Sequence, residues 1–110
     1  MGREYRSIAL SGDEACEALT AYVGAREDTQ VNPKNIAGIE ITHGSGFTAK
    51  VSLANPLLDG RTQIDLREEE IAEAIVAFIR SKGHPLPRRG RKSISLINDD
   101  IALLIELDWF

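Results

Sequence analysis

Hydrophobic positions in the first half of the chain change from a period of two to a helical period and back. Residues 4–10 alternate, which predicts a strand, and residues 13–26 place apolar side chains on one stripe at helical spacing. Ser11 stands three residues before Glu14, the spacing of a capping box, and so marks the start of this helix. Alternation then returns on both sides of the glycine-containing residues 43–46, which predicts a β-hairpin.

The second half repeats this order. We expect a short strand at residues 64–66 and a helix over about 66–82 that ends at Gly83, because glycine commonly terminates helices. Residues 93–97 and 101–108 alternate again and predict a second hairpin around an Asn-Asp-Asp turn. Each half of the chain is therefore predicted to have the order β-α-β-β.

The two predicted helices also match residue by residue. Residues 14–23 and 70–79 have four identities in ten positions, and most of the differences exchange one apolar residue for another. An offset of 56 positions relates the two segments, which is about half of the chain. This match predicts an internal duplication, with units at about 5–54 and 61–108.

These observations predict an α+β fold. With 110 residues the chain has the size of one domain, and we expect residues 1–110 to form a single domain. Each predicted strand has one apolar face, so both helices are expected to pack on one face of a mostly antiparallel sheet. A pseudo-twofold axis would then relate the two halves.

The two predicted hairpins differ on the face that points away from the helices. The first hairpin has only polar residues on this face: Glu40, Thr42, Thr48, Lys50 and Ser52. The second places Ile97, Ala102 and Leu104 there, and Phe110 has the same parity, whereas Trp109 continues the core-facing positions. Adjacent apolar residues on a sheet face are typical of a covered surface. We therefore expect Ile97, Leu104 and Phe110 to bind a second copy of the chain or another protein, the alternative being scattered exposed apolar residues.

The net charge of −4 is unevenly distributed. Residues 80–92 contain six lysines and arginines and no acidic residue, so the remainder carries −10. Four of these cations lie in a predicted loop at residues 85–92: Arg88, Arg89, Arg91 and Lys92. Such a loop can bind an acidic protein surface or the phosphate backbone of nucleic acid. The acidity of the remaining chain and the lack of aromatic residues in the loop weigh against nucleic acid.

Catalytic and metal-binding patterns are weak in this sequence. Cys16 is the only cysteine and has no evident cationic neighbour to activate it, so a small, half-buried structural residue is expected. His43 and His84 lie in predicted loops without partners at metal-ligand spacing, so we expect no metal and no other cofactor. Residues 43–46 lack the lysine and the strand–helix context of a phosphate loop. The acidic residues within 68–73 are typical of a solvated helix N-terminus.

The sequence thus predicts a non-catalytic protein-binding domain, a small adaptor or inhibitor that acts as a homodimer. No segment approaches the length of an apolar membrane span and the N-terminus has no secretory signal, so we expect a cytoplasmic protein without membrane contacts. Two alternatives stay open. One is a nucleic-acid-associated regulator that uses the basic loop 85–92. The other is a small-molecule binder or enzyme at the cleft between the two repeats, to which His43 would contribute.

Overall fold

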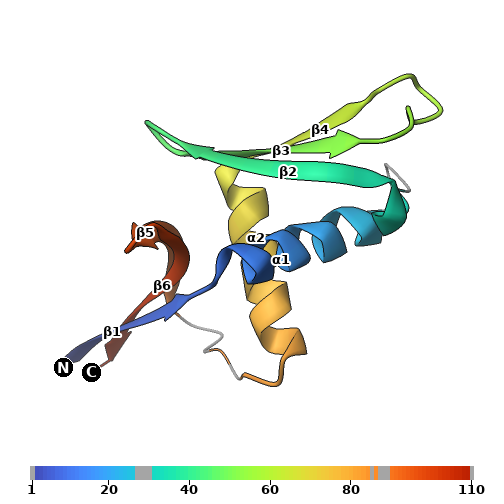
Figure 1. The fold of residues 1–110 in the computed structure, drawn as a ribbon. Coiled ribbons are helices and arrows are strands. Elements are labelled where there is room, and N and C mark those ends of the chain that lie inside the picture. Colours follow the sequence, from blue (N-terminus) through green and yellow to red (C-terminus); the bar gives the residue numbers. More distant parts are fainter. Residues whose placement is uncertain (1, 27–30, 85, 87–89, 110) are drawn as a thin grey trace.

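The computed structural model describes residues 2–26, 31–84, 86 and 90–109, of which residues 108 and 109 are described by their backbone only. The elements follow the chain as β1 (Gly2–Ala9), α1 (Gly12–Ala25), a short 3-10 helix η1 (Pro33–Asn35), β2 (Ile36–His43), β3 (Phe47–Leu53), β4 (Gln63–Leu66), α2 (Glu68–Ser81), β5 (Arg91–Ile97) and β6 (Asp100–Trp109) (Figure 1). The α+β class and the predicted order of strands and helices are confirmed. The internal duplication stays a prediction.

The strands form two three-stranded antiparallel sheets, whereas the sequence analysis expected one sheet. Sheet A has the order β1-β6-β5 and sheet B the order β2-β3-β4. Each sheet combines a hairpin from one half of the chain with the single strand of the other half. Alternation of apolar residues fixes which face of a strand is buried, but it does not fix which strand edges pair. The single-sheet prediction failed for this reason.

The two single strands are paired in a similar way. Ile8 of β1 lies opposite Leu103 of β6, and Ile64 of β4 lies opposite Val51 of β3. Just after β1, the backbone N–H of Leu10 donates to the carbonyl of Ile101 at 2.9 Å. The halves of the chain are therefore held together by a reciprocal exchange of strands.

Local signals set the helix boundaries as expected. The Ser11 hydroxyl accepts a hydrogen bond from the Glu14 N–H (3.2 Å), and the Glu14 carboxylate accepts one from the Ser11 N–H (3.0 Å). This is the predicted capping box, and the backbone hydrogen bond from Ser11 lowers the pKa of Glu14. After α2, Gly83 takes a φ of 83°, a left-handed conformation that glycine adopts at little cost.

The acidic start of α2 does more than favour the helix dipole. Glu70 accepts a hydrogen bond from Arg26 at the end of α1, at 3.1 Å, and both side chains are half-buried. Glu73 accepts from the Tyr22 hydroxyl at 3.3 Å, and burial, together with the charge of Glu73, raises the pKa of Tyr22. These carboxylates link the two helices, so interpreting the acidic segment as only a solvated helix end was wrong.

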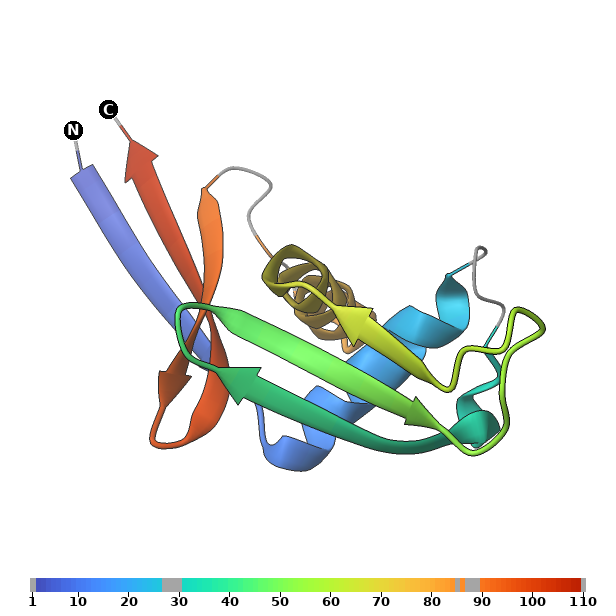
Figure 2. The same ribbon diagram turned by 90° about the horizontal axis from the view of Figure 1, so that it is seen from above.

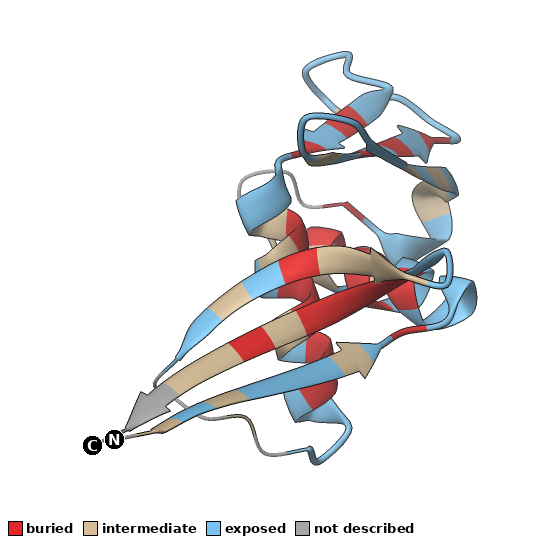
Figure 3. Ribbon diagram, turned by 90° about the vertical axis from the view of Figure 1, so that its left-hand side faces the viewer, coloured by how far each residue is buried: buried red, intermediate tan, exposed pale blue. Residues whose placement is uncertain are grey.

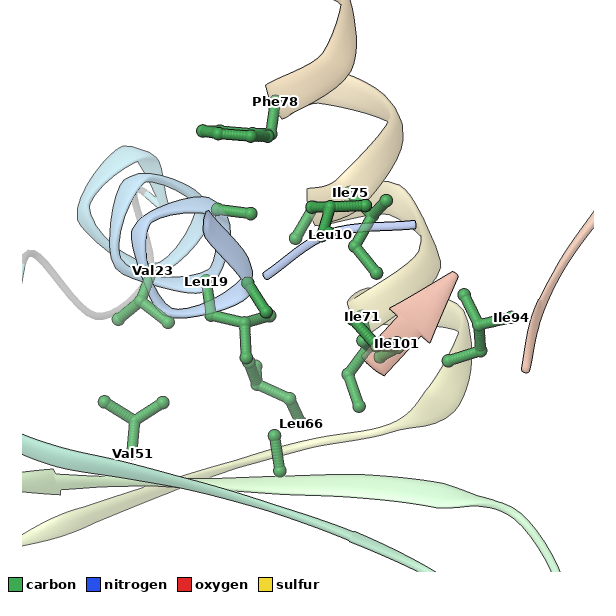
Figure 4. Packing of buried hydrophobic residues seen from close by; sticks show 14 of the residues in the cluster. Leu10, Leu19, Val23, Val51, Leu66, Ile71, Ile75, Phe78, Ile94 and Ile101 are labelled. Atoms are coloured by element: carbon green, nitrogen blue, oxygen red, sulfur yellow. The ribbon is translucent and has the colours of Figure 1, made fainter. Parts of the chain in front are cut away.

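The hydrophobic core is one continuous cluster that the helices share with both sheets (Figure 4). Its buried members include Leu19 and Val23 of α1, Ile71, Ile75 and Phe78 of α2, Val51 and Leu66 of sheet B, and Ile94 and Ile101 of sheet A. Burial of each such side chain is worth about 1.5–3 kcal/mol. Since both helices and both sheets contribute to the same cluster, neither sheet has a separate core among the described residues.

The molecule is elongated, with extents of 53 × 27 × 21 Å. Sheet B covers one side of the helix pair, and sheet A lies against another part of it (Figures 1 and 2). The outer ends of β1 and β6 extend together past the helices (Figure 2). Within the described part of the chain, no helix is long and apolar enough to cross a membrane.

Candidate functional site

The first candidate site is the face of sheet A that points away from the helices. Figure 3 shows the three strands of this sheet in front of the helices, with no described element covering them. Leu104 lies on this face in the central strand β6, and the register places it between Ser7 of β1 and Ser93 of β5. Next to this row, Glu106 lies opposite Tyr5 and Arg91. The face thus has a leucine flanked by small side chains and then by long ones.

This arrangement of short and long side chains produces a hollow on the surface of sheet A. The hollow measures about 580 Å³ and is lined by Tyr5, Arg6, Ser7, Arg91, Lys92, Ser93, Leu104, Ile105 and Glu106. Tyr5 is 67% exposed and is one of the two large apolar residues that the described structure leaves most open to solvent. We refer to this region as the sheet A hollow.

The charges around the sheet A hollow are mainly positive. Arg6, Arg91 and Lys92 line it, together with a single carboxylate, Glu106. Glu106 also lies 3.6 Å from the guanidinium of Arg3, measured between Oε1 and Nε. In the register, Arg6 and Lys92 pair with the core-facing Ile105, and Arg6 also contacts Glu4 at 2.6 Å. Arg91 and Glu106 are therefore the charged lining residues on the same face as Leu104.

The structure brings together residues that the sequence analysis assigned to two separate sites. Leu104, predicted as an interface residue, lines the same hollow as Arg91 and Lys92, predicted as part of a basic loop. Arg91 and Lys92 belong to strand β5 and not to a loop, because they pair with Glu106 and Ile105 of the long strand β6. Ile97 is half-buried at the opposite end of β5 and does not line the hollow. Phe110, Arg88 and Arg89 lie outside the described residues.

The corresponding face of sheet B is polar, as predicted. Its strands expose Glu40, Thr42, Thr48, Lys50, Ser52, Gln63 and Asp65. The register aligns Glu40, Lys50 and Asp65 across the three strands, so opposite charges are neighbours. Thr42 and Thr48 join through their hydroxyl oxygens at 2.8 Å. This face is thus exposed and polar, as expected of a sheet face that is covered by water.

The second candidate site is a cleft of about 290 Å³ between the two hairpins and the start of α1. Its apolar lining comes from Leu10, Ala15, Ile39, Ile41, Phe47, Leu96 and Ile101. Its polar lining comes from Ser11, Cys16, His43, Asp99 and Asp100. The cleft lies between the two predicted repeats, where the sequence analysis placed a possible small-molecule site with His43.

The walls of this cleft are held by identifiable contacts. The N–H of Phe47, at the end of the β2–β3 turn, donates to the Glu68 carboxylate of α2 at 3.1 Å. The rings of His43 and Phe47 lie 5.9 Å apart between centroids, tilted by 38°. On the other side, the β5–β6 turn has positive φ angles at Asn98 (51°) and Asp99 (68°), the backbone of a two-residue hairpin turn.

The sequence pattern does not identify Asp99 and Asp100 as cleft residues. Their residue types indicate a turn, because Asn and Asp are common in turns. A signal was nevertheless present: the second position of such a turn favours glycine, and the chain has an aspartate there instead. Cys16 is exposed and lines the cleft, although a half-buried position was expected.

The described residues contain no group of three His, Cys, Asp or Glu side chains that could hold a metal ion. Cys16 and His43 line the same cleft, but no hydrogen bond joins them among the described side chains.

The chain matches no known protein family, no curated protein and no solved structure. Its function is therefore inferred from the two surfaces described above.

Proposed function

We propose that this protein is a non-catalytic protein-binding domain, a small adaptor or inhibitor, that acts as a homodimer through the outer face of sheet A. The observation that carries the proposal is the setting of Leu104. This leucine is only half-buried and lies in the central strand of a sheet face that no described element covers. On the polar outer face of sheet B, no leucine, isoleucine or aromatic side chain occurs among the described residues.

The side chains around Leu104 suit close contact with another protein surface. Ser7 and Ser93 are short, so a partner side chain can reach the strands on both sides of Leu104. Tyr5 adds a large exposed aromatic ring, a residue type enriched at protein interfaces. Burial of a leucine is worth about 1.5–3 kcal/mol, and a symmetric dimer buries it twice.

The charges of this face are compatible with twofold symmetry. Arg91 and Glu106 are opposite each other in the register and occupy the same face. In a twofold interface the same patch meets itself, so a patch that carries both signs can pair with its copy. A homodimer is therefore the occupant that the residues favour, and a second protein bound to the dimer would complete the adaptor or inhibitor role.

The cellular setting that fits this proposal is the cytoplasm. The chain has a single cysteine, Cys16, and its thiol is free and exposed. Exposed free thiols persist in reducing compartments.

The experiment that tests the dimer is light scattering coupled to gel filtration of the wild-type protein and Leu104→Lys. We expect a wild-type dimer at about 100 μM and a folded Leu104→Lys monomer, because a lysine at the centre of the interface would bury an unpaired charge. Thr48→Lys, on the outer face of sheet B, is the matched control and should stay dimeric. A wild-type monomer, or a dimer that survives Leu104→Lys, would contradict the proposal.

A second candidate function is nucleic-acid binding by the cations of the sheet A hollow. Arg6, Arg91 and Lys92 line one hollow, and this grouping favours a polyanion as an alternative occupant. Binding of labelled DNA and RNA at about 50 mM salt distinguishes the two functions. Arg91→Ser with Lys92→Ser should weaken such binding and flatten its salt dependence, and wild-type protein that retains neither nucleic acid rules this function out.

A further inference from the structure

The cleft between the two hairpins has an apolar interior. Ile39, Ile41 and Phe47 of the β2–β3 hairpin lie on one side, and Leu96 and Ile101 of the β5–β6 hairpin on the other. All of these except Ile101 are only half-buried, although each belongs to the inner, core-facing side of its sheet. The inner faces of the two hairpins therefore expose apolar surface to a shared space that the core does not fill.

The charged groups that line this space are of one sign. Asp99 and Asp100 line the cleft from the β5–β6 turn, Asp100 at a position that shares the outer parity of Ile97, and no described lysine or arginine lines it. Neither carboxylate has an ion-pair partner among the described residues, whereas Glu17, Glu70 and Glu106 elsewhere are each within reach of a lysine or arginine. The formal charge of the cleft lining is therefore negative.

The start of α1 also borders the cleft. The N-terminal end of a helix carries about half a positive charge from the helix dipole, so it attracts anions. A carboxylate of the chain already occupies this helix end, because Glu14 of the capping box accepts a hydrogen bond from the Ser11 N–H at 3.0 Å. With Glu14 present, the helix end does not offset the charges of Asp99 and Asp100.

We propose that the cleft binds a small molecule with an apolar body and a cationic head, such as an arylalkyl amine. The body would pack between Ile41 and Phe47 on one side and Leu96 on the other, and the ammonium group would lie at the β5–β6 turn, near Asp99. A volume of about 290 Å³ is at the lower end of ligand pockets, which fits a ligand of this size. This site is separate from the sheet A hollow and does not depend on the dimer.

Three probes with the same phenyl ring and a two-carbon chain separate the contributions of shape and charge. They are 2-phenylethylamine, 2-phenylethanol and 3-phenylpropanoate, with positive, neutral and negative heads. Titrations are followed by NMR spectra of backbone amides in ¹⁵N-labelled protein at low salt. We expect the amine to bind about tenfold more tightly than the alcohol, the size of one charge-assisted contact in a partly exposed site, and the carboxylate to bind most weakly. Shifted amides should fall at residues 10–16, 39–47 and 96–101.

Two variants test the carboxylates, and one controls for charge alone. Asp99→Asn combined with Asp100→Asn should remove the preference for the amine over the alcohol, whereas Asp65→Asn on the outer face of sheet B should keep it. Asp99→Gly replaces a residue at φ 68° by the one best suited to it, so this variant should melt at a higher temperature and bind the amine less tightly. A weaker binder that is also more stable has not lost binding through unfolding.

Several results would overturn the proposal. One is the absence of amine binding up to about 10 mM, a generous limit for a ligand of nine heavy atoms. Equal affinities for the amine and the alcohol, or a preference for the amine that survives the double Asn variant, would also contradict it. So would shifted amides in the sheet A hollow instead of the cleft. The titration repeated with the Leu104→Lys protein should give the same affinity for the amine, because the cleft is separate from the sheet A hollow.

Discussion

Sheets A and B are built alike and differ on their outer faces. Each joins a hairpin to the single strand of the other half of the chain, and each supplies its inner face to the same core. The outer face of sheet B is polar throughout, whereas that of sheet A has Leu104 and Tyr5. Because the core constrains only inner positions, the outer positions are free to vary, and their residues indicate how each face is used.

The two sheets also differ in the length of the single strand. The β1 strand has eight residues and β4 has four. The four residues of β4 stay close to the helices, while the outer part of β1 accompanies β6 beyond them (Figure 2). Tyr5 of β1 pairs with Glu106 of β6, at a position beyond the length that β4 has in sheet B, so the sheet A hollow depends on the additional strand length.

The largest effect is expected from cavities in the shared core. Leu103 of sheet A and Val51 of sheet B are fully buried. Leu103→Ala should lower the free energy of unfolding by about 2–5 kcal/mol, and Val51→Ala by less, because truncation of valine removes fewer carbon atoms than truncation of leucine. Urea denaturation followed by circular dichroism should show one transition for each variant. Two separate transitions would show that the sheets unfold independently and that the core is not shared.

A smaller effect is expected at the glycines that precede the strands. A Cβ on Gly90, before β5, would lie 2.8 Å from Leu107 Cδ2 and 2.9 Å from the Glu106 carbonyl oxygen, at a φ of 110°. We expect Gly90→Ala to cost about 2–4 kcal/mol, from overpacking and backbone strain together. Gly60, before β4, has a φ of 88° and open space around it.

Gly60→Ala is the control for backbone strain alone and should cost about 1–2 kcal/mol. The same urea measurements apply. Equal losses at the two positions would mean that sheet A tolerates a shift of β6, and the close packing of Gly90 would then have no energetic weight.

The hairpin turns of the two sheets should respond differently to glycine. Asp99→Gly should raise the free energy of unfolding by about 0.5–1 kcal/mol, because the φ of 68° is unfavourable for a residue with a Cβ. The β2–β3 turn already contains Gly44 and Gly46. Ser45→Gly in that turn should therefore give no gain, and thermal unfolding of the two variants provides the comparison.

The smallest effect concerns the two helices that follow the single strands. The N-terminus of α1 has a serine cap, whereas the α2 cap residue, Arg67, makes no side-chain cap hydrogen bond. The pKa of Glu14 is lowered by its hydrogen bond with the Ser11 N–H, so this interaction stabilises the fold above the ordinary pKa of 4.5 and is lost as the pH falls below it. Glu14→Gln should therefore be less stable than wild type at pH 7, with a difference that shrinks towards pH 3. A difference that does not change with pH would mean that the carboxylate charge has no role in the cap.

The parts of this structure that depend on local sequence were predictable. Ser11 marked the start of α1 through its capping side chain, and Gly83 marked the end of α2 through its left-handed backbone. The alternation around residues 43–46 identified a hairpin. The partition of strands between two sheets was not predictable, because β1 and β4 are apolar on one face whichever neighbour they pair with.

The candidate sites follow the same division. The apolar parity of Leu104 was visible in the sequence, but its proximity to Arg91 and Lys92 depends on the register between β5 and β6. The cleft was harder still to predict, since its carboxylates come from a turn and its apolar walls from elements distant in sequence. Residues that act together through tertiary structure leave no periodic signal of their own.

The exchange of single strands has a consequence for how the protein is synthesised. Among the described strands, β1 leaves the ribosome first, and its partner β6 emerges last. Sheet B can assemble as soon as β4 has been made, but β1 stays an unpaired edge until β6 follows, and unpaired edges invite association with other chains. At about 5–20 residues per second, this interval lasts several seconds or more. Arg3, Glu4 and Arg6 place charges along β1, the usual protection of an exposed strand edge, and so suit a segment that must wait for its partner.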